Sequence, residues 1–423
     1  DWTTSYRHLS GGTEFSRYDL TYDGGLNTTG NLTGVVESGS VQGSSTVAYQ
    51  YDQLSRLISE VRTGVGSYTR TYEYDLSGNV TKVGTGFGGA GGANQNFATY
   101  DLSNKISSIS GGSRSHNFLG GITAATVPAT YSGGVPSGGA LTFSGYSYNV
   151  LGKLTSGGGE TVRYTAEGLR GAVKPNSTSP FTVLIYAGER VIGEISSSGA
   201  AVAYTWGPTG IVSKRDLQGT PKSAWYHFGP QGETRYLTDS VGVVTDSYRY
   251  TAYGRQLNIT GSSINPYRYG GRYGYYTDLN LKVIAAGQRY YAPELYRWLT
   301  RDPIKYDGGD NVYAYVKGNP VKFVDPDGLE IYFIDKLSNE EQKIFKAAIS
   351  KIESVESGKN FMKKFQGKGS TNVYLYAGEW GASNLQDGTN NFYIDFCVKP
   401  KLLFEDGVVR KATLPRIIVH ELS

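Results

Sequence analysis

The sequence predicts a mainly β protein made of repeated antiparallel hairpins, followed by a small α+β domain. Three observations predict this fold class. Glycine and tyrosine are abundant, with 58 and 35 copies in 423 residues. Tyr-Asp pairs recur along the chain, several of them followed by a glycine at a turn position. The composition then changes abruptly near residue 330, so a second kind of domain begins there.

The overall composition limits the classes of function. A net charge of +4 with 18% charged residues does not predict binding to nucleic acid or to a membrane surface. No apolar run approaches the length of a membrane span. The single cysteine, Cys397, excludes an internal disulfide framework. Because the chain begins at Asp1 with neither Met nor a signal-peptide pattern, we interpret it as a piece of a longer polypeptide.

The Tyr-Asp motifs predict hairpins. Asp can accept hydrogen bonds from the turn backbone, and Gly tolerates the positive φ that such turns need. Aromatic and β-branched residues alternate with polar ones between the turns, which is typical of strands. A single hairpin cannot bury its own apolar face, so we expect many to stack in one continuous curved sheet. The motifs are Tyr51-Asp52, Tyr74-Asp75 with Gly78, Tyr100-Asp101, Tyr148-Asn149 and Tyr164-Thr165.

Residues 330–423 differ from everything before them. They hold 7 of the glycines and 4 of the tyrosines, but 11 lysines against 10 in the whole preceding segment. The segment before residue 330 is therefore long and rich in glycine and tyrosine, whereas the segment after it has an ordinary composition. We expect a domain boundary at this position.

Residues 245–329 carry a specific resemblance. They contain the phrases SYRYTAYGRQL, NPYRYGGRYGYY, RYYAPELYRWLTRDPI and GGDNVYAYVKGNPVKFVDPDGL. With the earlier repeats, these phrases resemble the YD repeats of the Rhs (rearrangement hotspot) and Tc-toxin C-component family. The resemblance implies a β ribbon that spirals into a hollow shell. Residues 1–265 would be the repeat wall and residues 266–329 the cap of the shell.

Two aspartates stand apart from the repeats. Asp302 in RDPI and Asp325 in VDPDGL each precede a proline, which fixes the next φ and stiffens the turn. If two carboxyls are held close together, one pKa rises and the other falls, which gives an acid and a base from one residue type. Such a pair can activate water against a peptide carbonyl. The alternative interpretation is that both are ordinary Asp-Pro turns.

The family resemblance implies what this pair would do. The corresponding region of the family resembles an aspartyl autoprotease that cuts after the Leu of an Asp-Pro-x-Gly-Leu motif. Carried over, the scissile bond is Leu329–Glu330, where the composition changes. Arg301, beside Asp302, would keep that carboxylate ionised or polarise the scissile carbonyl. It could equally be a plain surface arginine.

The segment after Leu329 predicts the order helix, strands, helix. Capping-box spacing and apolar periodicity predict a helix over about 339–356. Strands are predicted for TNVYLYAGEW (371–380) and NNFYIDFCVK (390–399), where Cys397 would be a small buried thiol. A last helix, LPRIIVHELS (414–423), would begin behind an N-cap threonine.

The final helix contains His420 and Glu421, the start of an HExxH pattern. In HExxH two histidines one turn apart bind zinc, and the glutamate serves as general base. The tail resembles metallopeptidase-type effector domains of Rhs toxins. We therefore expect zinc in a full-length effector, none in the shell, and none in this chain, which lacks the second histidine. His8, His116 and His227 are too scattered in sequence to predict a metal site. A His-Glu pair on an ordinary helix is the alternative.

These observations predict a toxin-delivery protein. Its shell would encapsulate a C-terminal effector and free it by autoproteolysis. The resemblance implies as partners the remainder of the shell or a partner shell subunit, a secretion or injection apparatus, and a cognate immunity protein. It also implies secretion or delivery into target cells. The alternatives are a YD-repeat cell-surface adhesion or carbohydrate-binding protein without cleavage, or an effector of another enzyme class, such as a nuclease.

Overall fold

The computed structural model describes residues 4–333, except 11, 24–29, 87–93, 111, 129–130, 133–134, 137–139, 208–209 and 330, together with five short strands beyond them. The chain divides into two compact units. The first contains residues 1–206 and 210–334, and the second contains residues 207–209 and 335–423.

The first large sheet of the repeat wall has eight strands in chain order, each antiparallel to the next. A meander of this kind is what consecutive hairpins produce. The strands are β1 (Ser5–Ser10), β2 (Thr13–Tyr22), β3 (Leu32–Gly39), β4 (Ser45–Tyr51), β5 (Leu57–Gly64), β6 (Tyr68–Tyr74), β7 (Val80–Gly86) and β8 (Gln95–Asn96).

The second large sheet has twelve strands, again in chain order. They are β16 (Ser147–Tyr148), β17 (Leu154–Gly157), β18 (Glu160–Tyr164), β19 (Arg170–Lys174), β20 (Thr182–Ala187), β21 (Arg190–Ser196), β22 (Ala201–Gly207), β23 (Gly210–Asp216), β24 (Lys222–Phe228), β25 (Thr234–Thr238), β26 (Val244–Tyr250) and β27 (Gln256–Thr260). The prediction of a mainly β wall of antiparallel hairpins is confirmed for the described residues.

Short strands separate the two large sheets, so the prediction of one continuous sheet is wrong. They form three small sheets, β9–β10, β11–β12–β15 and β13–β14. Glycine and serine are frequent in this segment, and glycine offers no side chain for cross-strand packing, so the strands stay short. Their bounds are β9 (Ala98–Tyr100), β10 (Ile106–Ile109), β11 (Ser113–His116), β12 (Ile122–Pro128), β13 (Tyr131–Ser132), β14 (Val135–Pro136) and β15 (Ala140–Phe143).

The Tyr-Asp repeats explain how neighbouring hairpins are joined. Asp75 Oδ1 accepts the backbone N–H of Asn79 at 2.9 Å, and Gly78 takes a left-handed φ of 81°. The Tyr74 hydroxyl donates to the carbonyl of Leu57, in the preceding strand pair, at 2.6 Å. Each tyrosine therefore ties its own turn to the hairpin before it. The same bond runs from Tyr51 to Leu32, Tyr100 to Val80, Tyr148 to Ile122 and Tyr164 to Leu154.

A buried ionic network joins the first large sheet to the second. Glu37 on β3 accepts hydrogen bonds from Arg62 on β5 at 2.7 Å and from Arg235 on β25 at 2.9 Å. All three side chains are less than a tenth exposed. Burial by itself would raise the pKa of Glu37, but the two guanidinium groups hold it below its ordinary value. The carboxylate is therefore charged and links strands far apart in the sequence.

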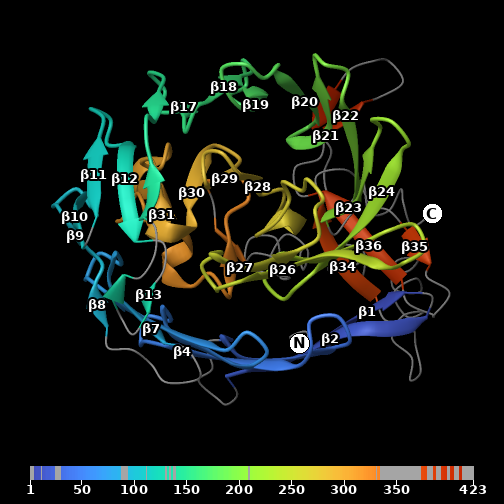
Figure 1. Ribbon diagram of the computed structural model, residues 1–423, viewed down its shortest axis with the longest axis horizontal. Coiled ribbons are helices and arrows are strands. Elements are labelled where there is room, and N and C mark those ends of the chain that lie inside the picture. The colour runs from blue at the N-terminus through green and yellow to red at the C-terminus, as the bar shows by residue number, and fades with distance from the viewer. Residues whose placement is uncertain are drawn as a thin grey trace. The chain divides into compact units, whose positions relative to one another are not determined.

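The cap is a four-stranded antiparallel meander with short 3-10 helices around it. Figure 1 shows its strands, coloured yellow to orange, flanked by wall strands of both large sheets. A two-stranded sheet, β32–β33, follows the meander. The bounds are β28 (Tyr276–Asp278), β29 (Val283–Ala286), β30 (Arg289–Ala292), β31 (Arg297–Trp298), β32 (Phe323–Val324), β33 (Tyr332–Phe333), η1 (Gly271–Tyr273), η2 (Pro293–Leu295), η3 (Lys305–Gly308) and η4 (Val316–Gly318).

Aromatic side chains form the core of the cap. Tyr291 stacks on Tyr315 with ring centroids 3.9 Å apart, and Trp298 meets both rings edge-on. All three are buried. The cap is also tied to the wall, because the Tyr313 hydroxyl donates to the carbonyl of Gly120 at 3.1 Å. The cap strands thus have a rigid frame on which side chains can be positioned.

The second unit is described only through its strands. β34 (Val373–Gly378) pairs in parallel with β36 (Phe392–Cys397), and β35 (Asn384–Gln386) pairs antiparallel to β36. A separate pair consists of β37 (Lys401–Leu403) and β38 (Val409–Lys411). The strands predicted over 371–380 and 390–399 are therefore present, and Cys397 ends β36. The predicted helices over 339–356 and 414–423 lie outside the described residues.

Candidate active site

The two predicted aspartates lie on turns of the cap. Asp302 follows β31, and its Oδ1 accepts the backbone N–H of Ile304 at 3.0 Å. Asp325 directly follows β32, and its backbone N–H donates to the Tyr275 hydroxyl at 2.9 Å. Both side chains are buried. Each carboxyl therefore has its backbone fixed, which restricts where its oxygens can point.

One guanidinium group joins the two carboxyls. Arg289 on β30 places Nη1 2.9 Å from Asp302 Oδ2 and Nη2 2.9 Å from Asp325 Oδ2. The guanidinium carbon lies 4.2 Å from the ring centroid of Trp298, so the arginine rests on an aromatic face. The planar fork of arginine suits this double contact, because its two Nη groups each donate to a different carboxyl. The structure thus brings Asp302 and Asp325 to one cation.

The pKa of both carboxyls is raised, so the expectation that one would rise and the other fall is wrong: each carboxyl is buried, and burial disfavours its charged form. Burial raises the pKa of Asp325 to about 8, and the nearby carboxyls of Asp327 and Asp302 add to this effect although Arg289 opposes it. Burial also raises the pKa of Asp302, and Arg289 again opposes the shift. At neutral pH Asp325 is therefore mainly protonated. The site can offer a proton from one carboxyl while the other stays available as a base.

Leu329, the residue before the predicted scissile bond, is held at this site. Its backbone N–H donates to Asp325 Oδ1 at 2.9 Å and to Asp327 Oδ1 at 3.0 Å. Gly328 has a φ of 70°, and a Cβ built on it would lie 2.6 Å from the carbonyl oxygen of Ala286. Only glycine allows the loop to approach β29 this closely. Glu330, on the other side of the bond, lies outside the described residues.

Arg301 has a different partner from the one expected. Its Nε donates to the Tyr313 hydroxyl at 3.2 Å, whereas Arg289 is the arginine between the two carboxyls. Sequence reasoning missed Arg289 because it lies in a strand, outside the Asp-Pro motifs. A signal was available: RYYA (289–292) is an arginine in an otherwise apolar strand, and a buried charge needs a partner.

Two of the three histidines in the wall lie together, although their sequence positions are far apart. The rings of His8 on β1 and His227 on β24 have centroids 5.2 Å apart. Burial lowers the pKa of His8 to about 3, helped by His227, and burial lowers the pKa of His227 to about 4. In the described part of the chain, no three His, Cys, Asp or Glu side chains are grouped to hold a metal ion. His420 and Glu421 lie outside the described residues, so the zinc prediction stays a prediction.

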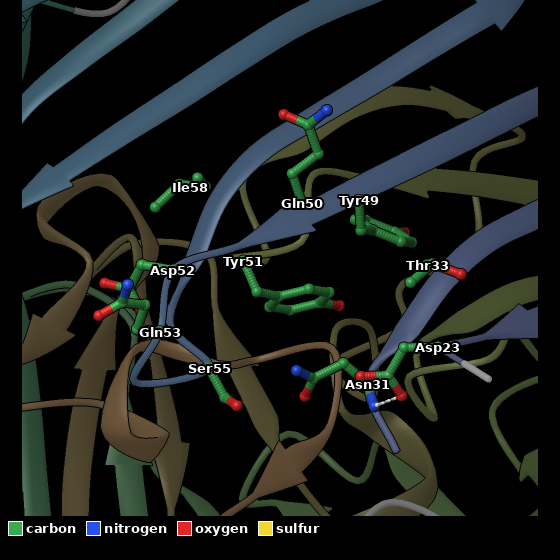
Figure 2. Close-up of a pocket in the computed structure, with 10 residues that line it drawn as sticks. All are labelled: Asp23, Asn31, Thr33, Tyr49, Gln50, Tyr51, Asp52, Gln53, Ser55 and Ile58. Carbon is green, nitrogen blue, oxygen red and sulfur yellow. Dashed lines mark hydrogen bonds between the residues drawn. The ribbon is translucent and has the colours of Figure 1, made fainter. Parts of the chain in front are cut away.

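An open pocket of about 500 Å³ lies on the wall (Figure 2). Asp23, Asn31 and Tyr51 are among its lining residues, and the backbone N–H of Asn31 donates to Asp23 Oδ1 at 2.9 Å. The Tyr51 hydroxyl is already engaged by the carbonyl of Leu32. The pocket includes neither carboxyl of the cap site, and we assign no chemistry to it.

No helix within the described residues is long and apolar enough to cross a membrane.

Comparison with solved structures identifies the class of fold. The crystal structure of TcdB2-TccC3 superposes on 76% of this chain and 18% of that chain, with a TM-score of 0.54 and 20% identity. A Tc holotoxin pore of Photorhabdus luminescens gives a TM-score of 0.53 at 19% identity, over 78% of this chain and 17% of that chain. The first unit therefore has the antiparallel β fold of the Tc-toxin shell.

Curated proteins related in sequence include toxins and nucleases. The chain is 27% identical over 298 residues to tRNA nuclease WapA of Bacillus subtilis (67% of this chain, 12% of the relative). It is 26% identical over 383 residues to toxin protein Tse5 of Pseudomonas aeruginosa (76% and 28%), and 29% identical over 175 residues to double-stranded DNA deaminase toxin A of Burkholderia cenocepacia (40% and 12%). The chain spans only 12 to 28% of the length of these relatives. No family model matches the chain. In sequence and fold it is similar to polymorphic toxins of the Rhs and Tc type.

Proposed function

We propose that this chain is the C-terminal part of an Rhs-type toxin-delivery shell that cuts itself after Leu329. In this proposal, residues 1–265 form the repeat wall, residues 266–329 form the cap that performs the cleavage, and residues 330–423 begin the effector. The relatives named as toxins and the fold shared with Tc-toxin shells support delivery of a toxin. The composition break at residue 330 supports a separate effector behind the cut.

One observation carries the autoprotease proposal. The guanidinium group of Arg289 lies 2.9 Å from Asp302 Oδ2 and 2.9 Å from Asp325 Oδ2. The other oxygen of Asp325, Oδ1, accepts the backbone N–H of Leu329. A protonated and an ionisable carboxyl are thus next to a chain segment that matches the predicted cleavage sequence. Two ordinary Asp-Pro turns would leave their carboxylates in water. Burying both beside one arginine costs desolvation free energy, which a purely structural turn does not require.

In the proposed reaction, a water molecule attacks the carbonyl carbon of Leu329. Asp302 accepts a proton from the water, and Asp325 donates its proton to the carbonyl oxygen. When the tetrahedral intermediate collapses, the proton on Asp302 passes to the nitrogen of Glu330 and the hydroxyl proton returns to Asp325. The C–N bond breaks, which leaves a carboxyl group on Leu329 and an amine on Glu330.

Substitution of the carboxyls tests the proposal. Asp302→Asn and Asp325→Asn should each lower the cleavage rate by about 10²-fold or more, since a positioned acid or base contributes about that factor. Asp310→Asn is the matched control, because Asp310 is an exposed carboxyl in the same part of the cap. Cleavage is read by gel and mass spectrometry after synthesis in a cell-free system. Unchanged cleavage in Asp325→Asn would refute the assignment.

We propose that residues 330–423 begin a toxic enzyme and that the partners of this chain are those of a toxin-delivery protein. A full-length effector that completes the HExxH pattern would use His420 as a zinc ligand and Glu421 as general base. A nuclease is the second candidate, because the WapA relatives are tRNA nucleases. The two-component TcdB2-TccC3 structure supports a partner shell subunit. A secretion or injection apparatus, an immunity protein and delivery into target cells complete the proposal. Zinc analysis and RNA cleavage by the complete effector would distinguish the two activities.

A further inference from the structure

The predicted scissile bond lies in a short loop closed by backbone pairing. β32 ends at Val324, directly before Asp325, and β33 begins at Tyr332, shortly after the bond. The two strands pair antiparallel, with Phe323 opposite Phe333 and Val324 opposite Tyr332. The described residues 325–329 and 331 therefore lie between the two strands of a β-hairpin, and Leu329 is the last described residue before the predicted cut.

The side of the loop before the bond is already fixed at several points. The N–H of Leu329 is held by Asp325 and Asp327, and the carbonyl of Asp327 accepts the N–H of Gln288 at 2.7 Å. Gly328 lies against the backbone of Ala286. These contacts fix Leu329 but leave the direction of the chain after it undetermined.

The side after the bond has its own anchor. Ile331 is partly buried against the core of the first unit, and β33 follows it at once. Anchors on both sides of the predicted cut restrict the motion of the backbone around it before the reaction begins. This kind of positioning lowers the barrier to attack. A displacement of about 1 Å at the reacting atoms can cost about 10²-fold in rate.

We infer that the backbone of β33 is the positioning element for the leaving side of the scissile bond, so cleavage requires the β32–β33 ladder as well as the two carboxyls. This inference rests on the proposed autoproteolysis after Leu329. We further infer that the cap holds the segment after the cut through main-chain hydrogen bonds between β32 and β33. The effector sequence beyond that point is then free to vary as long as its first residues can extend as a strand.

The test removes the ladder without touching the carboxyls. In Tyr332→Pro/Phe333→Pro the backbone N–H groups of β33 are lost, and proline cannot donate to a ladder. We expect the cleavage rate to fall at least about 10-fold, up to about 10²-fold. Tyr332→Val/Phe333→Val keeps both N–H groups and favours a strand, so it should restore most of the rate. Leu402→Pro, in β37 of the second unit, controls for the effect of proline itself.

Two further readouts separate positioning from general unfolding. If Asp325 donates the proton, the cleavage rate should fall as pH rises through its raised pKa of about 8, and this alkaline limb should stay in place in the slowed proline variant. A cap loosened as a whole would expose Asp325 and move that limb to lower pH. The proline pair and the valine pair are each combined with Asp325→Asn, which is expected to keep the chain uncut, and circular dichroism of these proteins checks that the wall stays folded.

The outcomes distinguish the two levels of the proposal. If the unmodified chain shows no cut at Leu329–Glu330, the proposed function fails. If that cut occurs but the proline pair cleaves at the unmodified rate, the positioning inference fails and the proposed function stands. A valine pair as slow as the proline pair would also overturn the inference, because the side chains rather than the ladder would then control the rate.

Discussion

The backbone N–H of Leu329 donates a hydrogen bond to Oδ1 of Asp325 at 2.9 Å. The other oxygen of the same carboxyl accepts Nη2 of Arg289. The residue before the proposed cut is therefore bound directly by one of the two proposed catalytic groups. Since substrate and carboxyls belong to one chain, we expect first-order cleavage that does not depend on protein concentration.

Cleavage should slow at alkaline pH. The reaction needs a proton on Asp325, whose pKa is raised to about 8 by burial, so the rate should fall as pH rises through about 8. The measurement is the cleaved fraction over time after cell-free synthesis, in buffers from about pH 5 to pH 10. A rate that keeps rising above about pH 9 would argue against a protonated carboxyl in the mechanism.

The stability of the uncut chain should also depend on Asp325. Its folded pKa of about 8 exceeds the ordinary value of 3.8, so the folded state binds more protons between these values. The contribution is fully present below about pH 4 and is lost as pH rises to about 8. The comparison is Asp302→Asn with Asp302→Asn/Asp325→Asn, which are both expected to stay uncut.

Between about pH 4 and pH 8 the single variant should lose about 1 kcal/mol or more relative to the double variant. Denaturant unfolding at both pH values gives the two free energies of unfolding. Parallel pH dependence in the two proteins would show that Asp325 titrates normally.

Arg289→Lys should impair cleavage although it conserves charge. A lysine carries all its N–H donors on one nitrogen, so it cannot reproduce the two separate contacts in which Nη1 and Nη2 each lie 2.9 Å from a different carboxyl. We expect the rate to drop about 10²-fold, as for other losses of positioning. Arg301→Lys is the matched control, since Arg301 donates to Tyr313 and not to the carboxyl pair. Equal rates in both lysine variants would contradict the role given to Arg289.

Glu37→Gln should strongly destabilise the wall. The substitution removes the carboxylate that Arg62 binds and leaves Arg235 with the more distant Glu233, at 3.6 Å, and breaking such a buried network costs about 3–5 kcal/mol. Glu14→Gln, which breaks the exposed pair of Glu14 with Arg7, should cost at most about 1 kcal/mol. Urea unfolding followed by circular dichroism measures both. A small cost for Glu37→Gln would show that the seam between the sheets does not depend on this carboxylate.

The histidine pair should make the wall acid-sensitive. His8 and His227 have folded pKa values of about 3 and 4, below the ordinary 6.5, so the unfolded chain binds more protons below pH 6.5. Their contribution to stability is present above about pH 6.5 and is lost as pH falls toward 4. Arg235, Tyr18 and Tyr236 also face the pair. His8→Phe/His227→Phe should flatten the fall of the melting temperature between pH 7 and pH 4. An unchanged slope would assign the acid sensitivity to other groups.

The wall was predictable from sequence because its rules are local. An Asp-x-x-Gly turn and alternating strands fix each hairpin by contacts within a few residues, as the bond from Asp75 to Asn79 shows. The Asp-Pro motifs likewise pointed to Asp302 and Asp325. Arg289 could not be predicted in the same way, because its partners are brought together by the folding of three separate cap segments. The pairing of His8 with His227 was missed for the same reason: it depends on contact between the first and second large sheets.

The mass of the purified chain, made in water with heavy oxygen, tests the central claim most directly. The account predicts two fragments, one ending at Leu329 with heavy oxygen in its new carboxyl group and one beginning at Glu330. Asp302→Asn/Asp325→Asn should give a single uncut mass. An uncut unmodified chain, a cut at another bond, or equal cleavage in the double variant would contradict the account.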